Sequence, residues 1–204
     1  MFLPTPEFDT VYKKISNMTM VSPDRLVAIY NIAKVCRELP VPGDFLELGC
    51  CKGGISYMLA SIANEDTNVF AIDTFEGLPE ILPEDGNQII GMWKVDYNDI
   101  KRFLDTAPHK VYVMEGLVED ILGQWNCVHD RKFSLIHFDL NLYGPTIFSL
   151  EKLWDRVISG GCVIFDDYLW EGTPGVRKAV DEFFGNINKF KHWVVTPQLG
   201  IIKP

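Results

Sequence analysis

The chain has 204 residues, 47% of them hydrophobic, which suits one compact α/β domain with a substantial core. Its 28 acidic and 19 basic residues give a net charge of −9, which argues against a protein that binds the phosphate backbone of nucleic acids. The odd number of cysteines, five, predicts no disulfide framework. No signal-peptide pattern and no long apolar run is present, so we expect a cytoplasmic protein without a membrane partner. We expect residues 1–204 to form a single domain, with residues 1–40 as an N-terminal helical cap.

The first clear helical pattern begins at Ser22-Pro23, which reads as an N-cap followed by a first helical turn. Leu26, Tyr30 and Ala33 follow at helical spacing, and the pattern ends before Pro40. We therefore predict one helix over this stretch.

A glycine turn follows, in the segment Asp44–Gly54 (DFLELGCCKGG). A short apolar strand leads into the turn, and the helical stretch Ile55–Ala63 follows it. Gly49 and Gly54 match the two ends of the dinucleotide pattern G-x-G-x-x-G, but Cys51 occupies the middle glycine. That glycine is the one that lets the backbone approach a pyrophosphate. The turn thus predicts a nucleotide-like ligand without a diphosphate.

Acidic residues near this turn indicate which ligand binds there. Asn68–Asp73 (NVFAID) reads as a second strand, and it ends in an acid at the distance where nucleotide-binding α/β folds hold ribose hydroxyls. Glu47, just before the turn, suits a cationic group better than a phosphate. An adenosyl compound that carries an ammonium group meets both conditions, and S-adenosylmethionine is such a compound.

The segment Glu80–Tyr97 lacks a regular pattern, because prolines and glycines interrupt it. Long irregular segments in compact domains are often lids or binding loops. Its aromatic residues, among them Trp93, either stack on an acceptor substrate or pin the loop to the core. Trp170, in the later loop Tyr168–Pro174, is the better candidate for a residue that contacts the second substrate.

The next predicted strand is Lys110–Met114 (KVYVM), which we expect to be a third central strand. The turn that follows it, Gly116–Leu122, would place backbone near an adenine ring. Gly116 and Leu117 are therefore candidate residues for binding S-adenosylmethionine.

The segment from His137 to Tyr168 is the most informative part of the chain. Phe133–Leu140 is an apolar run that contains Asp139, a helical pattern follows until Gly160-Gly161, and Cys162–Phe165 is a second apolar run that ends in Asp166-Asp167. A strand–helix–strand crossover makes the two strands parallel, so these acids should meet at the carboxyl edge of one sheet. Open α/β sheets bind ligands at that edge.

Three carboxylates at one edge would repel each other and raise each other's pKa unless a cation lay among them. Oxygen ligands around an open site suit Mg²⁺ or a similar hard ion. The alternative is that Asp139, Asp166 and Asp167 are solvated strand ends or helix caps.

Towards the C-terminus, Thr173-Pro174 should begin a helix, and the segment His192–Ile202 reads as a closing hairpin.

Four segments of the chain carry a resemblance to a known family: Asp44–Ser56, Asp73–Pro79 (DTFEGLP), Phe138–Thr146 (FDLNLYGPT) and Gly160–Tyr168 (GGCVIFDDY). They resemble the macrocin O-methyltransferase family, metal-dependent class I enzymes that act on sugar hydroxyls of natural products. The resemblance implies a Rossmann-like fold: a seven-stranded, mostly parallel sheet with helices on both faces and a C-terminal antiparallel hairpin.

The resemblance also implies a role for individual residues. Glu47, Gly49 and Gly54 would line the methionine part of S-adenosylmethionine, and Asp73 would hold its ribose. Ser56, Thr74, Gly116 and Leu117 complete the expected donor site, and Asp139, Asp166 and Asp167 would hold Mg²⁺. Many relatives carry a second acid where this chain has Asn141, so the role of that acid is open here.

The reaction expected from these features is methyl transfer to a hydroxyl of a small, sugar-containing acceptor. The donor and acceptor must be aligned and a base must take the proton. Asp139 is one candidate, although a metal-bound carboxylate is a weak base, and His137 on the same strand is the next. A histidine in an apolar strand is more often a hydrogen-bonded core residue.

Two other functions remain open from the sequence. One is an NAD(P)-dependent oxidoreductase, disfavoured by Cys51 and by the lack of a Tyr-x-x-x-Lys pair beside the sheet. The other is a non-catalytic module that binds an adenosyl ligand. The acceptor and the oligomeric state, including a homo-oligomer, are left open.

Overall fold

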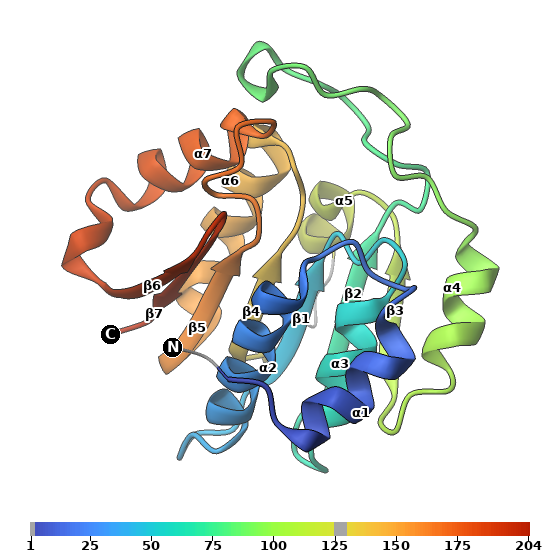
Figure 1. The fold of residues 1–204 in the computed structure, drawn as a ribbon. Coiled ribbons are helices and arrows are strands. Elements are labelled where there is room, and N and C mark those ends of the chain that lie inside the picture. The colour runs from blue at the N-terminus through green and yellow to red at the C-terminus, as the bar shows by residue number, and fades with distance from the viewer. Residues whose placement is uncertain (1–2, 125–129) are drawn as a thin grey trace.

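A seven-stranded sheet organises the chain (Figure 1). The structure, a computed structural model, describes residues 3–124 and 130–204. The strand order is β3-β2-β1-β4-β5-β7-β6; the first five strands are parallel, and β7 runs antiparallel to both β5 and β6. This confirms the predicted sheet and its C-terminal hairpin. The strands are β1 (Asp44–Leu48), β2 (Val69–Asp73), β3 (Val111–Glu115), β4 (Phe133–Phe138), β5 (Val157–Phe165), β6 (Lys191–Val195) and β7 (Gln198–Ile202).

Helices cover both faces of the sheet (Figure 1). None of those in the described ranges is both long and apolar enough to cross a bilayer. The α-helices are α1 (Pro6–Ile15), α2 (Pro23–Arg37), α3 (Gly54–Ile62), α4 (Tyr97–Leu104), α5 (Val118–Gln124), α6 (Tyr143–Leu153) and α7 (Pro174–Phe184), and the 3-10 turns are η1 (Pro83–Asp85), η3 (Trp154–Arg156) and η4 (Ile187–Lys189).

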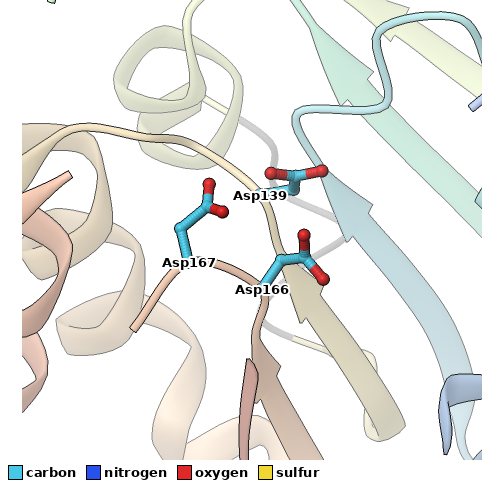
Figure 2. A group of neighbouring side chains, drawn as sticks. All are labelled: Asp139, Asp166 and Asp167. Carbon is cyan, nitrogen blue, oxygen red and sulfur yellow. The ribbon is translucent and has the colours of Figure 1, made fainter. Parts of the chain in front are cut away.

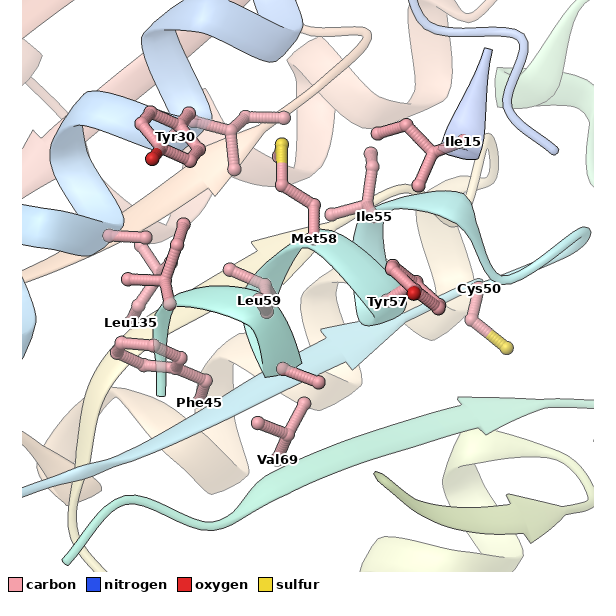
Figure 3. Close-up of a cluster of buried hydrophobic side chains, with 14 of the residues drawn as sticks. Ile15, Tyr30, Phe45, Cys50, Ile55, Tyr57, Met58, Leu59, Val69 and Leu135 are labelled. Atoms are coloured by element: carbon pink, nitrogen blue, oxygen red, sulfur yellow. The ribbon is translucent and has the colours of Figure 1, made fainter. Parts of the chain in front are cut away.

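Two hydrophobic cores lie on the two faces of the sheet, because alternate residues of a strand point to opposite sides. In β1, Phe45 belongs to the core beneath α1, α2 and α3, whereas Leu46 and Leu48 belong to the core beneath α5, α6 and α7. Figure 3 shows the first core, in which Met58 and Leu59 of α3 lie among residues from α2 and the strands. Burial of this kind is the main stabilising contribution to the fold.

One strand lies elsewhere than predicted. The sequence predicted a central strand over Lys110–Met114, but β3 is the edge strand and pairs only with β2. Val111 and Val113 pack against the first core, and for this reason the segment looks as apolar as a central strand. Tyr112 points the other way and is exposed.

The boundary between α6 and β5 was also predicted wrongly. The helix ends at Leu153, and β5 begins at Val157, before the two glycines that were expected to end the helix. The register shifts between the pairs Phe133↔Val157 and Leu135↔Cys162, so the glycines lie in an irregular stretch of the strand. Gly160 adopts a φ of +81°, which glycine tolerates without steric cost.

Candidate active site

A cavity of about 380 Å³ opens at the carboxyl edge of the parallel strands. This is where open α/β sheets place their ligands. The segments that follow β1, β2, β3, β4 and β5 all contribute to its wall. Of the residues predicted to bind the donor or a metal, those on the wall are Gly49, Asp73, Thr74, Gly116, Leu117, Asp139, Asp166 and Asp167.

The glycine turn after β1 forms one side of the cavity. Gly49 has a φ of +84°, and a Cβ atom built on it would lie 2.0 Å from the backbone oxygen of Asp139. The turn therefore touches the end of β4 directly. Cys51 also has a positive φ, 44°, and its amide donates to Oδ2 of Asp73 at 2.7 Å. The backbone thus bends at Cys51, where the dinucleotide pattern has glycine.

Asp73 is fixed by the backbone on both of its oxygens. Besides the bond from Cys51, its Oδ1 accepts a hydrogen bond from the amide of Phe75 at 2.7 Å. Burial raises the pKa of this carboxyl group, although the backbone hydrogen bonds act in the opposite direction. A carboxylate oxygen accepts more than one hydrogen bond, so Asp73 retains capacity for a ligand hydroxyl.

Three of the expected donor residues lie away from this cavity. Glu47 is 1% exposed and accepts a hydrogen bond from Ser56, which is fully buried. Gly54 donates its amide to the carbonyl of Met18 at 2.9 Å. Glu47 and Gly54 instead line a neighbouring cavity of about 30 Å³, bounded by Met18–Val21. A space of that size holds little more than a water molecule, so these two residues meet a larger ligand only if residues 18–21 move.

Figure 2 shows the three acids converging from two strand ends. Each has a carboxylate oxygen within 4.8 Å of the others. The parallel ladder explains this arrangement, because it continues past the strands: the amide of Asp139 donates to Leu48, and that of Asp166 donates to Phe138. The prediction that Asp139, Asp166 and Asp167 meet at one edge is confirmed as geometry.

The electrostatics of this cluster differ from one acid to the next. Burial, and then the charges of Asp166 and Asp167, raise the pKa of Asp139 well above its usual range. Burial and the charge of Asp166 raise the pKa of Asp167 to about 6. Repulsion among the three carboxylates thus disfavours the ionised form of two of them. A divalent cation between them would offset this repulsion, and oxygen donors suit a hard cation. The donor set therefore fits Mg²⁺.

Asp166 is the exception, because positive and polar groups surround it. Burial alone would raise its pKa, but His137, Arg25 and Gln198 together lower it. The guanidinium of Arg25 donates to Oδ2 of Asp166 and lies 3.7 Å from Asp167, and Nε2 of Gln198 donates to Oδ1 of Asp166 at 2.7 Å. Among the described residues, Arg25 is the only basic one on the cavity wall.

Sequence reasoning missed Arg25 and Gln198. A signal existed for Arg25, which lies beside Leu26 on the buried side of a predicted helix, and a buried guanidinium requires an acidic partner. The partner itself could not be read from the sequence. Gln198 gave no such signal.

His137 is fully buried between two acids and lines neither cavity. Its Nδ1 lies 3.4 Å from Glu47, its lateral neighbour in the parallel ladder, and its Nε2 lies 3.7 Å from Asp166. Burial opposes the charged form, but the two acids outweigh it and raise the pKa of His137 to about 10. A buried imidazolium of this kind does not reach an acceptor in the cavity, so the geometry does not support His137 as the base.

Asn141 has a positive φ of 62°, and its Nδ2 donates to Oδ2 of Asp167 at 3.1 Å. The amide orients Asp167 without adding a further negative charge to the cluster. Trp93 and Trp170, both substantially exposed, also line the cavity, and they come from the two loops expected to meet an acceptor.

Comparison with known proteins identifies relatives of this chain. The chain is 27% identical over 181 residues to demethyldecarbamoylnovobiocin O-methyltransferase of Streptomyces niveus, covering 81% of this chain and 67% of the relative. It is 28% identical over 180 residues to mycinamicin III 3''-O-methyltransferase of Micromonospora griseorubida, covering 81% and 69%. Among solved structures, the O-methyltransferase NovP superposes with a TM-score of 0.77 at 22% identity, covering 91% of this chain and 82% of NovP.

The family model for macrocin O-methyltransferases (TylF) matches residues 12–194, nearly the whole chain and all of the cavity-lining residues named above. This match agrees with the resemblance read from the sequence, and it decides against the nicotinamide-dependent oxidoreductase. The chain therefore belongs to the macrocin O-methyltransferase family, and it is an S-adenosylmethionine-dependent O-methyltransferase with the fold of the class I enzymes.

Proposed function

We propose that the enzyme methylates a hydroxyl of a small, sugar-containing molecule, with Mg²⁺ held by Asp139, Asp166 and Asp167. One observation carries the proposal: the three acids lie on the same cavity wall as the glycine turn, and Gly49 contacts the backbone of Asp139. This arrangement would bring a donor methyl group and an acceptor oxygen together in one space. Alignment of this kind is the main requirement of methyl transfer.

The donor half of the cavity is assigned to the turns after β1, β2 and β3. Asp73 would hold the ribose hydroxyls, and Gly116 and Leu117 would lie against the adenine. The methionine part would extend towards Gly49 and the small cavity beside Glu47, whose negative charge suits an ammonium group. Residues 18–21 would then move to admit it.

The acids and their neighbours would act on the acceptor. When bound, Mg²⁺ would offset the negative charge of the cluster and lower the pKa of the acceptor hydroxyl. Asp139, whose own pKa is raised, would accept the proton of that hydroxyl. His137 and Arg25 would keep Asp166 ionised and fixed in position, and Asn141 would orient Asp167.

The charge of the cavity also bears on the acceptor class. Arg25, its basic residue within the described part of the chain, is already paired with Asp166. Apart from the proposed Mg²⁺, the described residues that line the cavity offer no unpaired basic side chain to the phosphates of a nucleoside diphosphate sugar. We therefore expect an uncharged glycoside, and the acidic protein as a whole should not bind nucleic acid.

The function is tested by measuring S-adenosylhomocysteine release from S-adenosylmethionine. Demethyldecarbamoylnovobiocin and mycinamicin III, the acceptors named for the relatives, would be compared with a thymidine diphosphate sugar. The glycosides should be methylated, and thorough chelation should stop the reaction until Mg²⁺ is returned. Donor binding without turnover of any glycoside would instead favour the non-catalytic adenosyl-binding module.

Donor binding gives a separate prediction. Asp73→Ala should weaken S-adenosylmethionine binding by about 1–3 kcal/mol, because a charged hydrogen bond to the ribose is lost. Isothermal titration calorimetry measures the change. Asp73→Asn is the matched variant, since it keeps the shape and one acceptor oxygen, and it should lose less. Unchanged affinity in Asp73→Ala would refute the ribose assignment.

A further inference from the structure

The roof segment, residues 79–93, follows β2 and covers one side of the cavity. Its two ends are joined by backbone hydrogen bonds, from Leu78 to Met92 at 3.0 Å and from Gly91 to Leu78 at 2.9 Å. Between these ends the chain projects beyond the carboxyl edge of the sheet towards α6 and α7 (Figure 1). Its cavity-lining residues are Pro79, Asn87, Gln88, Met92 and Trp93. Whatever holds the far end of this segment therefore shapes the cavity.

Asp85 is the buried charged group of the roof segment, and it is fully inaccessible to solvent. Its Oδ1 accepts a hydrogen bond from the amide of Tyr143 at 2.6 Å, and its Oδ2 accepts one from the amide of Leu82 at 2.9 Å. Tyr143 is the first residue of α6, and an amide at that position has no partner within its own helix. A carboxylate there also interacts favourably with the helix dipole.

The first turn of α7 closes around the same carboxylate. A Cβ atom on Gly175 would lie 2.2 Å from Oδ1 of Asp85, so only glycine admits the acid at this distance. Pro174, the first residue of α7, faces the position that a side chain on Gly86 would occupy. Asp85 thus fills a pocket between the beginnings of two helices that belong to the scaffold.

The other attachments of the roof segment to the scaffold are exposed. Glu84 accepts from Lys178 at 3.1 Å, and Gln88 donates to the carbonyl of Gly172. Exposed pairs contribute little, since water competes for the same groups and salt screens them. The buried charge-assisted bonds of Asp85 are the stronger attachment.

We infer that Asp85 is a positioning residue, which anchors the roof segment on α6 and α7 and thereby sets the acceptor side of the cavity. The acceptor assignment rests on the proposed function. The anchoring does not, and it can be tested without any acceptor. Trp93 and Met92 would keep their places on the wall only while Asp85 remains seated.

The test compares Asp85→Ala with the matched control Glu84→Gln, which removes a charge from the neighbouring exposed position. Hydrogen exchange followed by mass spectrometry should show exchange in residues 79–93 at least about tenfold faster in Asp85→Ala, from the loss of buried hydrogen bonds. Glu84→Gln should stay within about twofold of the wild type. Both variants should bind S-adenosylmethionine within about twofold of the wild type, because the donor half is built from other segments.

Asp85→Asn carries the test if Asp85→Ala fails to fold. It keeps an oxygen for the amide of Tyr143, so its exchange rate should fall between those of the wild type and the alanine variant. With the glycoside that the wild type methylates fastest, the KM for that glycoside should rise in the same order as the exchange rates.

Unchanged exchange in residues 79–93 of Asp85→Ala would overturn the anchoring. Faster exchange with an unaltered KM would overturn the role in acceptor positioning. If no glycoside is methylated by the wild type, the proposed function fails while the exchange result still decides on the anchor.

Discussion

Gly49→Ala is expected to remove donor binding and activity together, and to lower the free energy of unfolding by at least about 3 kcal/mol. The added methyl group would lie 2.0 Å from the backbone oxygen of Asp139, and a backbone atom cannot rotate away as a side chain can. The φ of +84° adds strain, because residues with a Cβ rarely adopt it. The turn after β1 and the end of β4 must then separate.

Gly185→Ala is the matched control, since its φ is +66° and a Cβ there would meet nothing within 4 Å. This variant has the backbone strain without the collision, so it should lower the free energy of unfolding by about 1–2 kcal/mol. Urea unfolding measures both variants, and calorimetry with S-adenosylmethionine measures donor binding. A loss of stability in Gly49→Ala no greater than that in Gly185→Ala would show that the contact with Asp139 is unimportant.

Asp166→Asn and Asp167→Asn should both reduce Mg²⁺ affinity by about tenfold or more, since each removes a charged ligand from the proposed site. Activity should fall with it and be partly restored by excess Mg²⁺, while donor binding should change little. Activity of the wild type after thorough chelation would contradict the metal site. The acids would then be electrostatic or capping groups.

In the metal-free protein, Asp166→Asn and Asp167→Asn should change the free energy of unfolding in opposite directions. Asp166→Asn removes the acid that Arg25 and His137 share and leaves them only Asp167 and Glu47, so it should destabilise the fold by about 3 kcal/mol. Asp167→Asn removes a repulsive charge and should be neutral or stabilising at pH 7. Urea unfolding without metal, with chelator present, measures both.

The effect of Asp167→Asn on stability should depend on pH, because the folded and unfolded states bind different numbers of protons at this residue. The pKa of Asp167 is raised from 3.8 to about 6 in the folded protein, so the folded state binds more protons than the unfolded state between these values. The contribution of Asp167 to stability is therefore present below about pH 4 and is lost as the pH rises through about 6. The gain in Asp167→Asn should accordingly shrink as the pH falls below 6. A gain that is the same at pH 5 and pH 7 would contradict the raised pKa.

The positions of the three acids could be predicted, because they follow from local sequence patterns and one rule of sheet topology. Asp139 and Asp166 directly follow apolar strands, and a crossover between parallel strands brings both strand ends to one edge. The glycine turn and Asp73 were predicted in the same way, each at the end of a short buried run.

The partners of the acids were not predictable, because they come from distant segments with no periodic relation to the strands. Arg25 reaches Asp166 from α2, Gln198 reaches it from β7, and Asp85 reaches α6 from an irregular loop. The sequence favoured a buried core position for His137, but it could not show that Glu47 and Asp166 lie on either side of the ring. Such contacts are fixed by tertiary packing.

The position of the two cavity-lining tryptophans has a consequence for how such enzymes diverge. Trp93 and Trp170 lie on connecting loops, whereas Asp139 and Asp166 directly follow core strands. Loops tolerate substitution and insertion far better than strands do, because little of the core depends on them. If Trp93 and Trp170 contact the acceptor, as proposed, substitutions in these two loops can admit a different acceptor while the acids at the strand ends stay unchanged.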